Sequence, residues 1–189
     1  VRLSYTGANL QRGLGHVVQA NWESGFALAF EHLLNLGHRR IGFYGHGCPN
    51  PDANPEFPHY QLMIRTLFES VKCELAPDAS LLFIHGHPDE SVRDRRVEEA
   101  LTGGARPTAV FAESDFKATF FIKVARRLGV KLPDDLSMVG YYDTPWAEAY
   151  DLDSVSVNPA ALAAAAVKLL KTDDPNRHIV MVEPRLVIR

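Results

Sequence analysis

Residues 107–143, PTAVFAESDFKATFFIKVARRLGVKLPDDLSMVGYYD, decide the fold. They begin with a short apolar run, Thr108–Ala112, that is typical of a buried strand. Ser114 and Asp115 then supply a helix N-cap, and apolar residues follow at helical spacing. Leu136–Tyr141 is the next apolar run. The stretch therefore predicts a strand, a helix and a second strand, the repeating unit of an α/β protein with a parallel sheet.

The same alternation of strands and helices continues toward both ends of the chain. Further helices are expected at residues 22–36, 59–71, 89–101 and 160–170. Further strands are expected at residues 1–5, 16–20, 40–44, 81–85, 154–157, 179–182 and 186–188, with an irregular loop at 144–153. This order favours parallel sheets flanked by crossover helices.

The composition narrows the class of protein. With 189 residues, 46% of them hydrophobic, the chain can bury a sizeable core. Its net charge of −3 does not provide the basic surface that binding to nucleic acid phosphates requires. The two cysteines, Cys48 and Cys73, have no zinc-ligand spacing and suggest no disulfide framework, which fits the cytoplasm. No stretch resembles a membrane span or a signal peptide, so no membrane partner is expected.

Polar and acidic residues follow two of the predicted strands. Glu113, Ser114 and Asp115 come after the first strand of the 107–143 stretch, and Tyr142 and Asp143 come after the second. Ligands of open parallel sheets bind beyond the carboxyl ends of the strands, so these residues are candidates for a binding pocket. Alternatives stay open for three of them: Asp115 as an N-cap without ligand contact, Asp143 as a structural loop acid, and Tyr142 as an ordinary wall of the pocket.

Several histidines also follow predicted strands. His46, His85 and His87 lie on the side where a cleft is expected, together with Glu113 and Asp115. Imidazoles and a carboxylate can form a zinc site, but this spacing matches no known ligand motif, and no metal is predicted. A pocket that prefers anionic effectors at low pH is another interpretation.

Five segments stand in a fixed order along nearly the whole chain. They are HLLNLGHRRIGFYG (32–45), PTAVFAESD (107–115), ARRLGVKLPDDLSMVGYYDTPWAE (125–148), SVSVNPAALAAAAVKLL (154–170) and EPRLVIR (183–189). Together they resemble the effector-binding core of LacI/GalR-type bacterial transcription regulators. The resemblance implies the type I fold of periplasmic binding proteins, with two lobes of parallel sheets flanked by helices.

The resemblance also implies how the chain divides. Residues 1–37 and 158–177 are expected in a partial N-terminal lobe, and residues 38–157 and 178–189 in a complete C-terminal lobe. The DNA-binding helix-turn-helix of the family has no counterpart in this chain, so any contact with operator DNA is expected through a domain that this chain lacks.

The family holds a small effector, often a sugar or nucleobase, in the cleft between the lobes. At the position of its usual arginine the nearest residues are His59 and Tyr60. Its usual asparagine is Ser114, followed by a matching Asp115, and its two paired acids are Tyr142 and Asp143. A frequent aromatic residue is replaced by His87 or Pro88. The resemblance therefore implies seven ligand-binding residues, His59, Tyr60, His87, Ser114, Asp115, Tyr142 and Asp143.

Two functions are consistent with this pattern. The first is the sensing and dimerisation core of a cytoplasmic transcription regulator, by default a repressor, which forms a homodimer and responds to a small molecule such as a sugar or nucleoside. The alternative is a periplasmic solute-binding protein for a sugar-like ligand. No enzyme activity and no cofactor are expected, because the chain has no phosphate-binding glycine loop and no nucleophile placed beside a base. Trp146 and Tyr150 are expected to pack a loop or a dimer surface.

Overall fold

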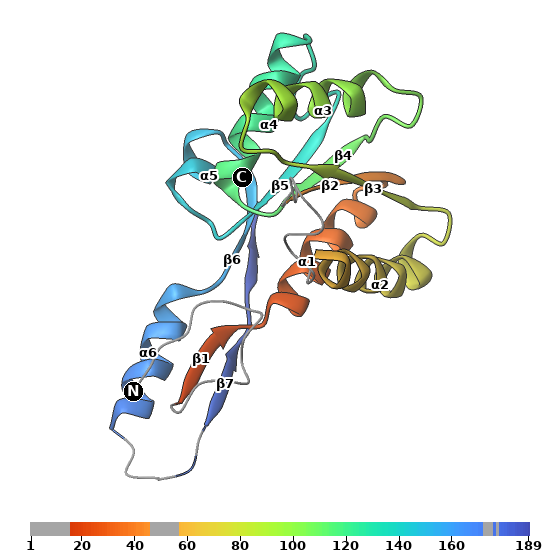
Figure 1. The fold of residues 1–189 in the computed structure, drawn as a ribbon. Coiled ribbons are helices and arrows are strands. Elements are labelled where there is room, and N and C mark those ends of the chain that lie inside the picture. The colour runs from red at the N-terminus through yellow and green to blue at the C-terminus, as the bar shows by residue number, and fades with distance from the viewer. Residues whose placement is uncertain (1–15, 46–56, 172–175, 177) are drawn as a thin grey trace.

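The computed structural model describes residues 16–45, 57–171, 176 and 178–189, with only the backbone described for residues 57–59. Within this part of the chain, eight strands form two separate sheets that belong to two lobes (Figure 1). The strands are β1 (Val17–Ala20), β2 (Arg40–Gly45), β3 (Ser80–His85), β4 (Ala109–Ala112), β5 (Ser137–Tyr141), β6 (Asp153–Ser156), β7 (Ile179–Val182) and β8 (Arg185–Val187). The helices are α1 (Trp22–Asn35), α2 (Phe57–Leu75), α3 (Glu90–Thr102), α4 (Asp115–Arg127), α5 (Pro145–Ala149) and α6 (Pro159–Leu170).

The larger lobe is built on a six-stranded sheet in the order β3-β2-β4-β5-β6-β8. The strands from β3 to β6 pair in parallel, and β8 joins β6 antiparallel at the edge. Helices α3 and α4 cover one face of this sheet and α1 and α2 the other (Figure 1). Each face has its own apolar core, and under α1 the rings of Phe30, Phe43 and Phe111 meet edge to face.

The smaller lobe consists of β1, β7 and α6. The two strands pair in parallel, with Val17 beside Ile179, and α6 packs against one face through Ala166 and Leu169. Helix α6 begins where the sequence places a start signal, because the side chain of Asn158 accepts from the N–H of Ala161 and Pro159 occupies the first turn.

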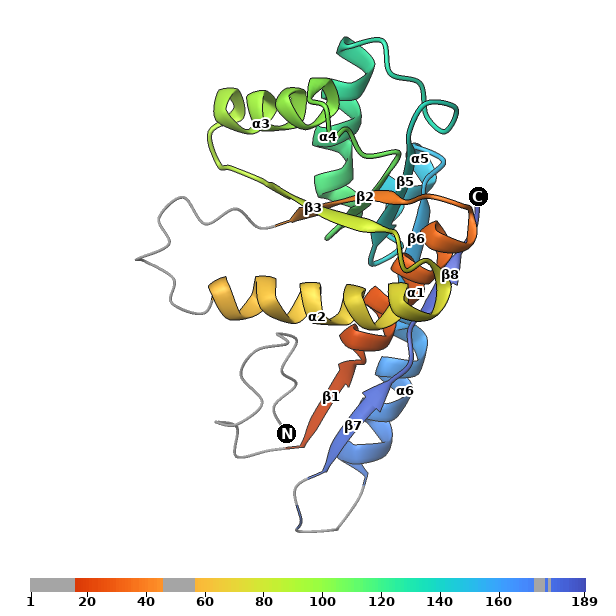
Figure 2. The same ribbon diagram turned by 90° about the vertical axis from the view of Figure 1, so that its right-hand side faces the viewer.

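In the described part of the chain, three crossings connect the lobes, between β1 and α1, between β6 and α6, and between β7 and β8. In each crossing a strand leaves its sheet at the carboxyl end, so the junction lies at the carboxyl ends of both sheets (Figure 2). Asn21 ties two crossings together: its N–H donates to the carbonyl of Val182 at 2.8 Å and its side chain to Glu183 Oε1 at 2.9 Å. Hydrogen bonds from Asn21 and then Ser24 lower the pKa of the Glu183 carboxyl.

The predicted fold class, α/β with parallel sheets flanked by helices, is confirmed. The expected strand at residues 1–5 lies outside the described residues. The expected loop at 144–153 contains a short helix, α5, because Pro145 occupies the first helical position and favours helical φ.

Two elements lie in a different lobe from the one expected for them. Helix α1 packs on the six-stranded sheet, because Phe26, Phe30 and Leu33 enter the same apolar core as β2 and β4. Strand β7 pairs with β1 in the smaller sheet, although it follows residue 178. The described part of the smaller lobe therefore excludes residues 22–37 and includes residues 179–182.

Candidate functional site

The carboxyl ends of β2 and β4 place a carboxylate beside the lobe junction. Glu113 directly follows β4, and its N–H donates to the carbonyl of Tyr44 at 2.9 Å. A Cβ atom on Gly45 would come within 2.9 Å of Glu113 Oε2, so the glycine at the end of β2 leaves the space that the carboxylate fills. One helical turn later, Lys117 Nζ lies 2.8 Å from the same oxygen. The Glu113–Lys117 ion pair is thus held at the edge of the sheet from two elements.

Tyr60, on α2, completes the surroundings of this carboxylate. Its hydroxyl donates to Glu113, and its ring packs against Phe43 with centroids 6.5 Å apart. Burial, followed by the negative charge of Glu113, raises the pKa of Tyr60 far above its ordinary value, and Tyr141 and Tyr142 add to this effect. The phenol therefore stays neutral and acts as a hydrogen-bond donor.

Tyr142 and Asp143 form an unusual turn at the end of β5. Their φ angles are 93° and 54°, in the left-handed region that side chains other than glycine rarely adopt. The turn is fixed because the N–H of Tyr142 donates to Val155 at 2.8 Å and that of Asp143 to Ser154 Oγ at 3.1 Å. The Tyr142 ring is 37% exposed and packs edge to face on Tyr141. Strained backbone that the surrounding structure enforces is common at binding sites, and here it aims an aromatic ring at the junction.

Ser114 and Asp115 make structural contacts. The hydroxyl of Ser114 caps α4 by accepting from the N–H of Lys117 at 3.2 Å. Asp115 is completely buried and accepts three hydrogen bonds, from the N–H and hydroxyl of Thr144 at 2.7 and 2.9 Å and from Ser154 Oγ at 2.6 Å. A ligand cannot reach the Asp115 carboxylate in this arrangement.

The carboxylate of Asp143 also has a partner within the protein. Arg189 Nη2 lies 2.6 Å from its Oδ1, and Nη1 of the same guanidinium donates to the carbonyl of Leu152 at 2.9 Å. This geometry agrees with the interpretation of Asp143 as a structural loop acid.

A side pocket of about 250 Å³ opens next to the Glu113–Lys117 pair, on the face of the sheet that α3 and α4 cover. It is lined by Tyr44, Gly45, Gly86, His87, Pro88, Arg93, Lys117 and Phe120. His87 Nδ1 accepts the N–H of Asp89 at 3.0 Å, so the proton of the neutral ring is on Nε2, which can donate. Burial raises the pKa of Tyr44 to about 12, which keeps its hydroxyl protonated.

The predicted histidines do not assemble into one cluster in the described residues. His85 interacts with Gln61 Nε2 at 3.1 Å and stacks on Phe83, whereas His87 lines the side pocket. His46 and the side chain of His59 lie outside the described residues. In the part of the chain that the structure describes, no group of three or more His, Cys, Asp or Glu side chains is arranged to hold a metal ion.

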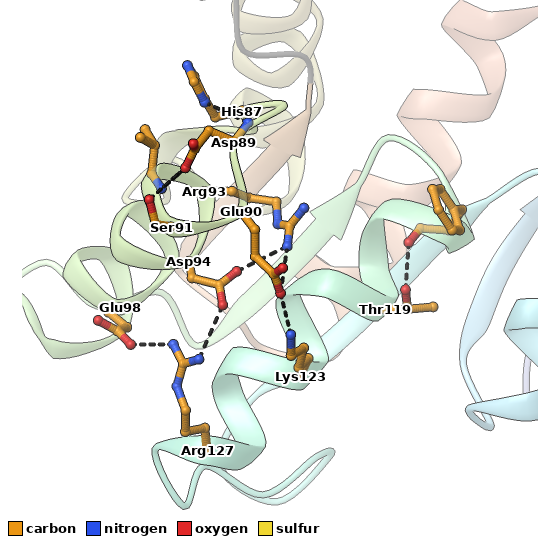
Figure 3. Close-up of polar contacts among 12 residues, drawn as sticks. His87, Asp89, Glu90, Ser91, Arg93, Asp94, Glu98, Thr119, Lys123 and Arg127 are labelled. Atoms are coloured by element: carbon orange, nitrogen blue, oxygen red, sulfur yellow. Dashed lines mark hydrogen bonds and ion pairs between the residues drawn. The ribbon is translucent and has the colours of Figure 1, made fainter.

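Helices α3 and α4 are joined beside the side pocket by a network of charged side chains (Figure 3). Asp94, which is only 7% exposed, lies 3.3 Å from Arg93 and 3.2 Å from Arg127. Arg93 Nη2 also lies 3.6 Å from Glu90, which pairs with Lys123 across the helices, and Arg127 also pairs with Glu98. The network fixes the position of Arg93, whose guanidinium lies 4.1 Å from the centroid of the Phe120 ring.

The structure therefore places Tyr60 against Glu113, with Tyr142 close enough to affect the Tyr60 phenol, and places His87 in the adjacent side pocket. It gives Ser114, Asp115 and Asp143 structural contacts. Lys117, Arg93 and Phe120 line the site but were not among the predicted ligand-binding residues. The spacing of Glu113 and Lys117, four residues apart at a helix start, is a signal that the sequence does contain.

Two lobes of parallel strands, with aromatic and charged side chains at the sheet edge that faces their junction, define a ligand-binding domain of the periplasmic-binding-protein type. Residues 30–189 match the periplasmic binding protein-like domain family. The chain belongs to this family, and over most of its length it is similar to the core of LacI/GalR-type regulators.

Relatives support this assignment along most of the chain. The ribose operon repressor of Haemophilus influenzae is 28% identical over 168 residues, which cover 86% of this chain and 48% of that protein. The transcriptional repressor PurR of Mannheimia succiniciproducens is 28% identical over 182 residues, which cover 92% and 51%. The chain thus spans about half the length of these curated relatives.

A solved structure agrees with the fold. The LacI transcriptional regulator from a Rhodococcus species superposes with a TM-score of 0.77 at 28% identity, covering 99% of this chain and 68% of that one. Among the described residues, no helix has both the length and the apolar character needed to cross a membrane.

Proposed function

We propose that this chain is the effector-sensing and dimerisation core of a cytoplasmic transcription regulator, by default a repressor. A small molecule bound between the lobes changes the affinity of the regulator for operator DNA, which is bound by a domain outside this chain. The observation that supports the proposal is the position of Glu113, the hydrogen-bond partner of Tyr60, at the carboxyl end of β4, because the crossings to the other lobe leave from the same edge of the sheet. Names of relatives such as the ribose operon repressor support the role in transcription.

The mechanism follows from linkage between binding and lobe arrangement. A ligand that binds one arrangement of the lobes more tightly shifts the population toward it, by as much as the difference in affinity. Coupling of this kind typically changes affinity at the second site by about 5- to 150-fold. In this chain the ligand acts by binding, and no catalytic step is proposed.

Tyr60, Tyr142 and His87 are the predicted ligand-binding residues that we propose as ligand contacts, together with Glu113, the hydrogen-bond partner of Tyr60. Aromatic rings supply flat apolar surfaces, and the carboxylate supplies an acceptor. His59 belongs to the same proposal by its position in the first turn of α2. Ser114, Asp115 and Asp143 support the site through the contacts described above.

An aromatic patch on α4 and α5 supports a homodimer. Phe116 and Trp146 are 49% and 45% exposed, and Phe116 contacts both Phe120 and Trp146 with ring centroids 4.8 and 5.8 Å apart. Exposed aromatic clusters are typical of protein interfaces, and most soluble homo-oligomers pair such patches about a twofold axis. We refer to Phe116, Phe120 and Trp146 as the aromatic patch.

The proposal is tested with the full-length protein and the DNA upstream of its own gene. Fluorescence anisotropy is expected to detect binding that weakens with salt and changes when a small-molecule effector is added. Absence of DNA binding at low salt, combined with tight binding of a small molecule, would contradict the regulator and favour a solute-binding protein.

A further inference from the structure

The side pocket offers an apolar surface in a small volume. Tyr44, Pro88 and Phe120 contribute rings to its lining, and the two lining glycines contribute backbone. The N–H of Gly86 is already donated to the carbonyl of Gly45 at 2.9 Å. The glycine backbone at this position therefore does not present the row of free N–H groups that phosphate sites use.

Among the described residues, the ionisable side chains that line the pocket are nitrogen groups, apart from the neutral phenol of Tyr44. They are His87, Arg93 and Lys117, and no aspartate or glutamate of the described part of the chain lines the pocket. Glu113 pairs with Lys117, and Glu90 and Asp94 pair with Arg93, but none of these acids is part of the lining. The pocket thus presents the positive partner of each ion pair to a ligand.

Hydrogen-bond donors predominate over acceptors at this site. Arg93 Nε is buried and has no acceptor among the described residues, and His87 Nε2 carries a proton because Nδ1 accepts from Asp89. The hydroxyls of a neutral sugar need acceptors as well as donors, and the lining residues that the structure describes include no carboxylate or amide side chain. A ligand group that only accepts hydrogen bonds fits this lining better.

We propose that the effector carries a carboxylate attached to an apolar group, and that this part of it lies in the side pocket. The carboxylate contacts Lys117 and His87, and the apolar group lies on Phe120 and Pro88. The inference rests on the proposed function, because the pocket adjoins the proposed effector cleft through the Glu113–Lys117 pair. It narrows the effector to a small organic acid.

Benzoate and its neutral isostere benzamide are the probes, with inorganic phosphate as the third. Calorimetric titration of the full-length protein at neutral pH is expected to show benzoate binding at least about tenfold more tightly than benzamide, as a charge-assisted contact requires. Benzoate is expected to raise the melting temperature as a ligand of the folded state. Equal binding of both aromatic probes, binding of phosphate alone, or no binding of any probe would overturn the inference.

Variants of α4 residues test whether the carboxylate of benzoate contacts Lys117. Lys117→Gln is expected to weaken benzoate about tenfold and leave benzamide unchanged, and Lys117→Arg is expected to retain benzoate binding. Arg126→Gln is the matched control, because Arg126 lies on the same helix over the ring of Tyr150 and does not line the pocket. Melting curves of each variant confirm that it is folded. An equal loss of benzoate in Arg126→Gln would contradict the assignment.

The proposal of a transcription regulator and the proposal of a carboxylate in the side pocket can be contradicted independently of each other. Binding to upstream DNA without any probe tests the regulator alone. If DNA binding responds to a sugar or nucleoside but not to benzoate, the regulator stands and the acid pocket is overturned. If benzoate binds with the expected Lys117 dependence but no DNA is bound, the pocket stands and the regulator is contradicted.

Discussion

Asp115 connects three segments of the larger lobe through one buried carboxylate. It lies in the first turn of α4, and its oxygens accept from Thr144, before α5, and from Ser154, in β6. The same side chain also explains Gly140 in β5, because a Cβ atom there would collide with Asp115 Oδ1. The family motif implies that Asp115 contacts a ligand, but in the structure this side chain instead stabilises the loop that follows Tyr142.

Substitution of Asp115 is expected to destabilise the fold. Asp115→Ala leaves buried donors on Thr144 and Ser154 without an acceptor, so the free energy of unfolding is expected to fall by roughly 2–4 kcal/mol. Urea denaturation measures this change. Ser114→Ala, which removes only the N-cap, is the control and is expected to cost about 1 kcal/mol. An Asp115→Ala variant as stable as the wild type would show that these hydrogen bonds contribute nothing net.

The buried phenol of Tyr44 is expected to make the free energy of unfolding depend on pH in the alkaline range. Burial raises its pKa from 10.0 in a model phenol to about 12 in the fold. A raised folded pKa favours the neutral form, so the contribution of Tyr44 is complete below pH 10 and is lost as pH rises toward 12. The free energy of unfolding is expected to fall over this range, and to fall less steeply in Tyr44→Phe. Lysine titration affects both proteins equally, so identical slopes would argue against this effect of burial.

At the scale of elements, α3 and α4 are joined by charges while their apolar residues face the sheet. Asp94 is buried between Arg93 and Arg127, whereas Glu98 and Lys123 lie in more solvent. Exposed ion pairs contribute little to stability, but removal of one partner of a buried pair leaves an uncompensated charge. The network therefore depends mainly on Asp94.

The two classes of ion pair are separated by a pair of variants. Asp94→Ala is expected to lower the free energy of unfolding by about 2–3 kcal/mol, because the charges it balances lose their partner. Arg127→Gln is expected to stay close to the wild type, and its small effect should disappear in high salt. Chemical denaturation at low and high salt gives both quantities. The opposite order of effects would mean that α3 and α4 are held by their exposed pairs.

At the scale of the whole molecule, the lobes and the aromatic patch serve different purposes. The lobes are connected by crossings at Asn21, Asn158 and Glu183, and we expect any movement of one lobe relative to the other to occur about these segments. The aromatic patch lies on α4 and α5 of the larger lobe, and one of its members, Phe120, also lines the side pocket. A dimer formed through the patch would therefore bring the partner copy close to the side pocket.

The proposed dimer can be tested by introducing charged side chains into the aromatic patch. Phe116→Lys combined with Trp146→Lys places like charges at a twofold interface and is expected to give a monomer in sedimentation velocity. Leu62→Lys is the control, because Leu62 is 61% exposed on α2 and lies outside the aromatic patch. If the double variant stays dimeric, the interface is elsewhere on the surface.

Periodicity in the sequence predicts most elements correctly, because apolar spacing reports directly on which face of a helix or strand is buried. It does not report which sheet that face meets, and the lobe division implied by the family resemblance differs from the structure at α1 and β7. The sequence predicts only part of the site, because contacts between residues far apart in the chain leave no local pattern. Strand ends identify Glu113 and Tyr142, but the contact between Asp115 and Ser154 spans 39 residues and has no local signal.

The pairing of β1 with β7 has a consequence for the order of folding during synthesis. Paired residues in these strands are 162 positions apart, whereas α1 and β2 to β6 follow one another without interruption by the smaller lobe. Contacts of such high sequence separation form late, and chains emerge from the ribosome amino end first. The larger lobe from α1 to β6 can therefore collapse while β1 is still unpaired, and the smaller sheet forms only after residues 179–182 have left the exit tunnel.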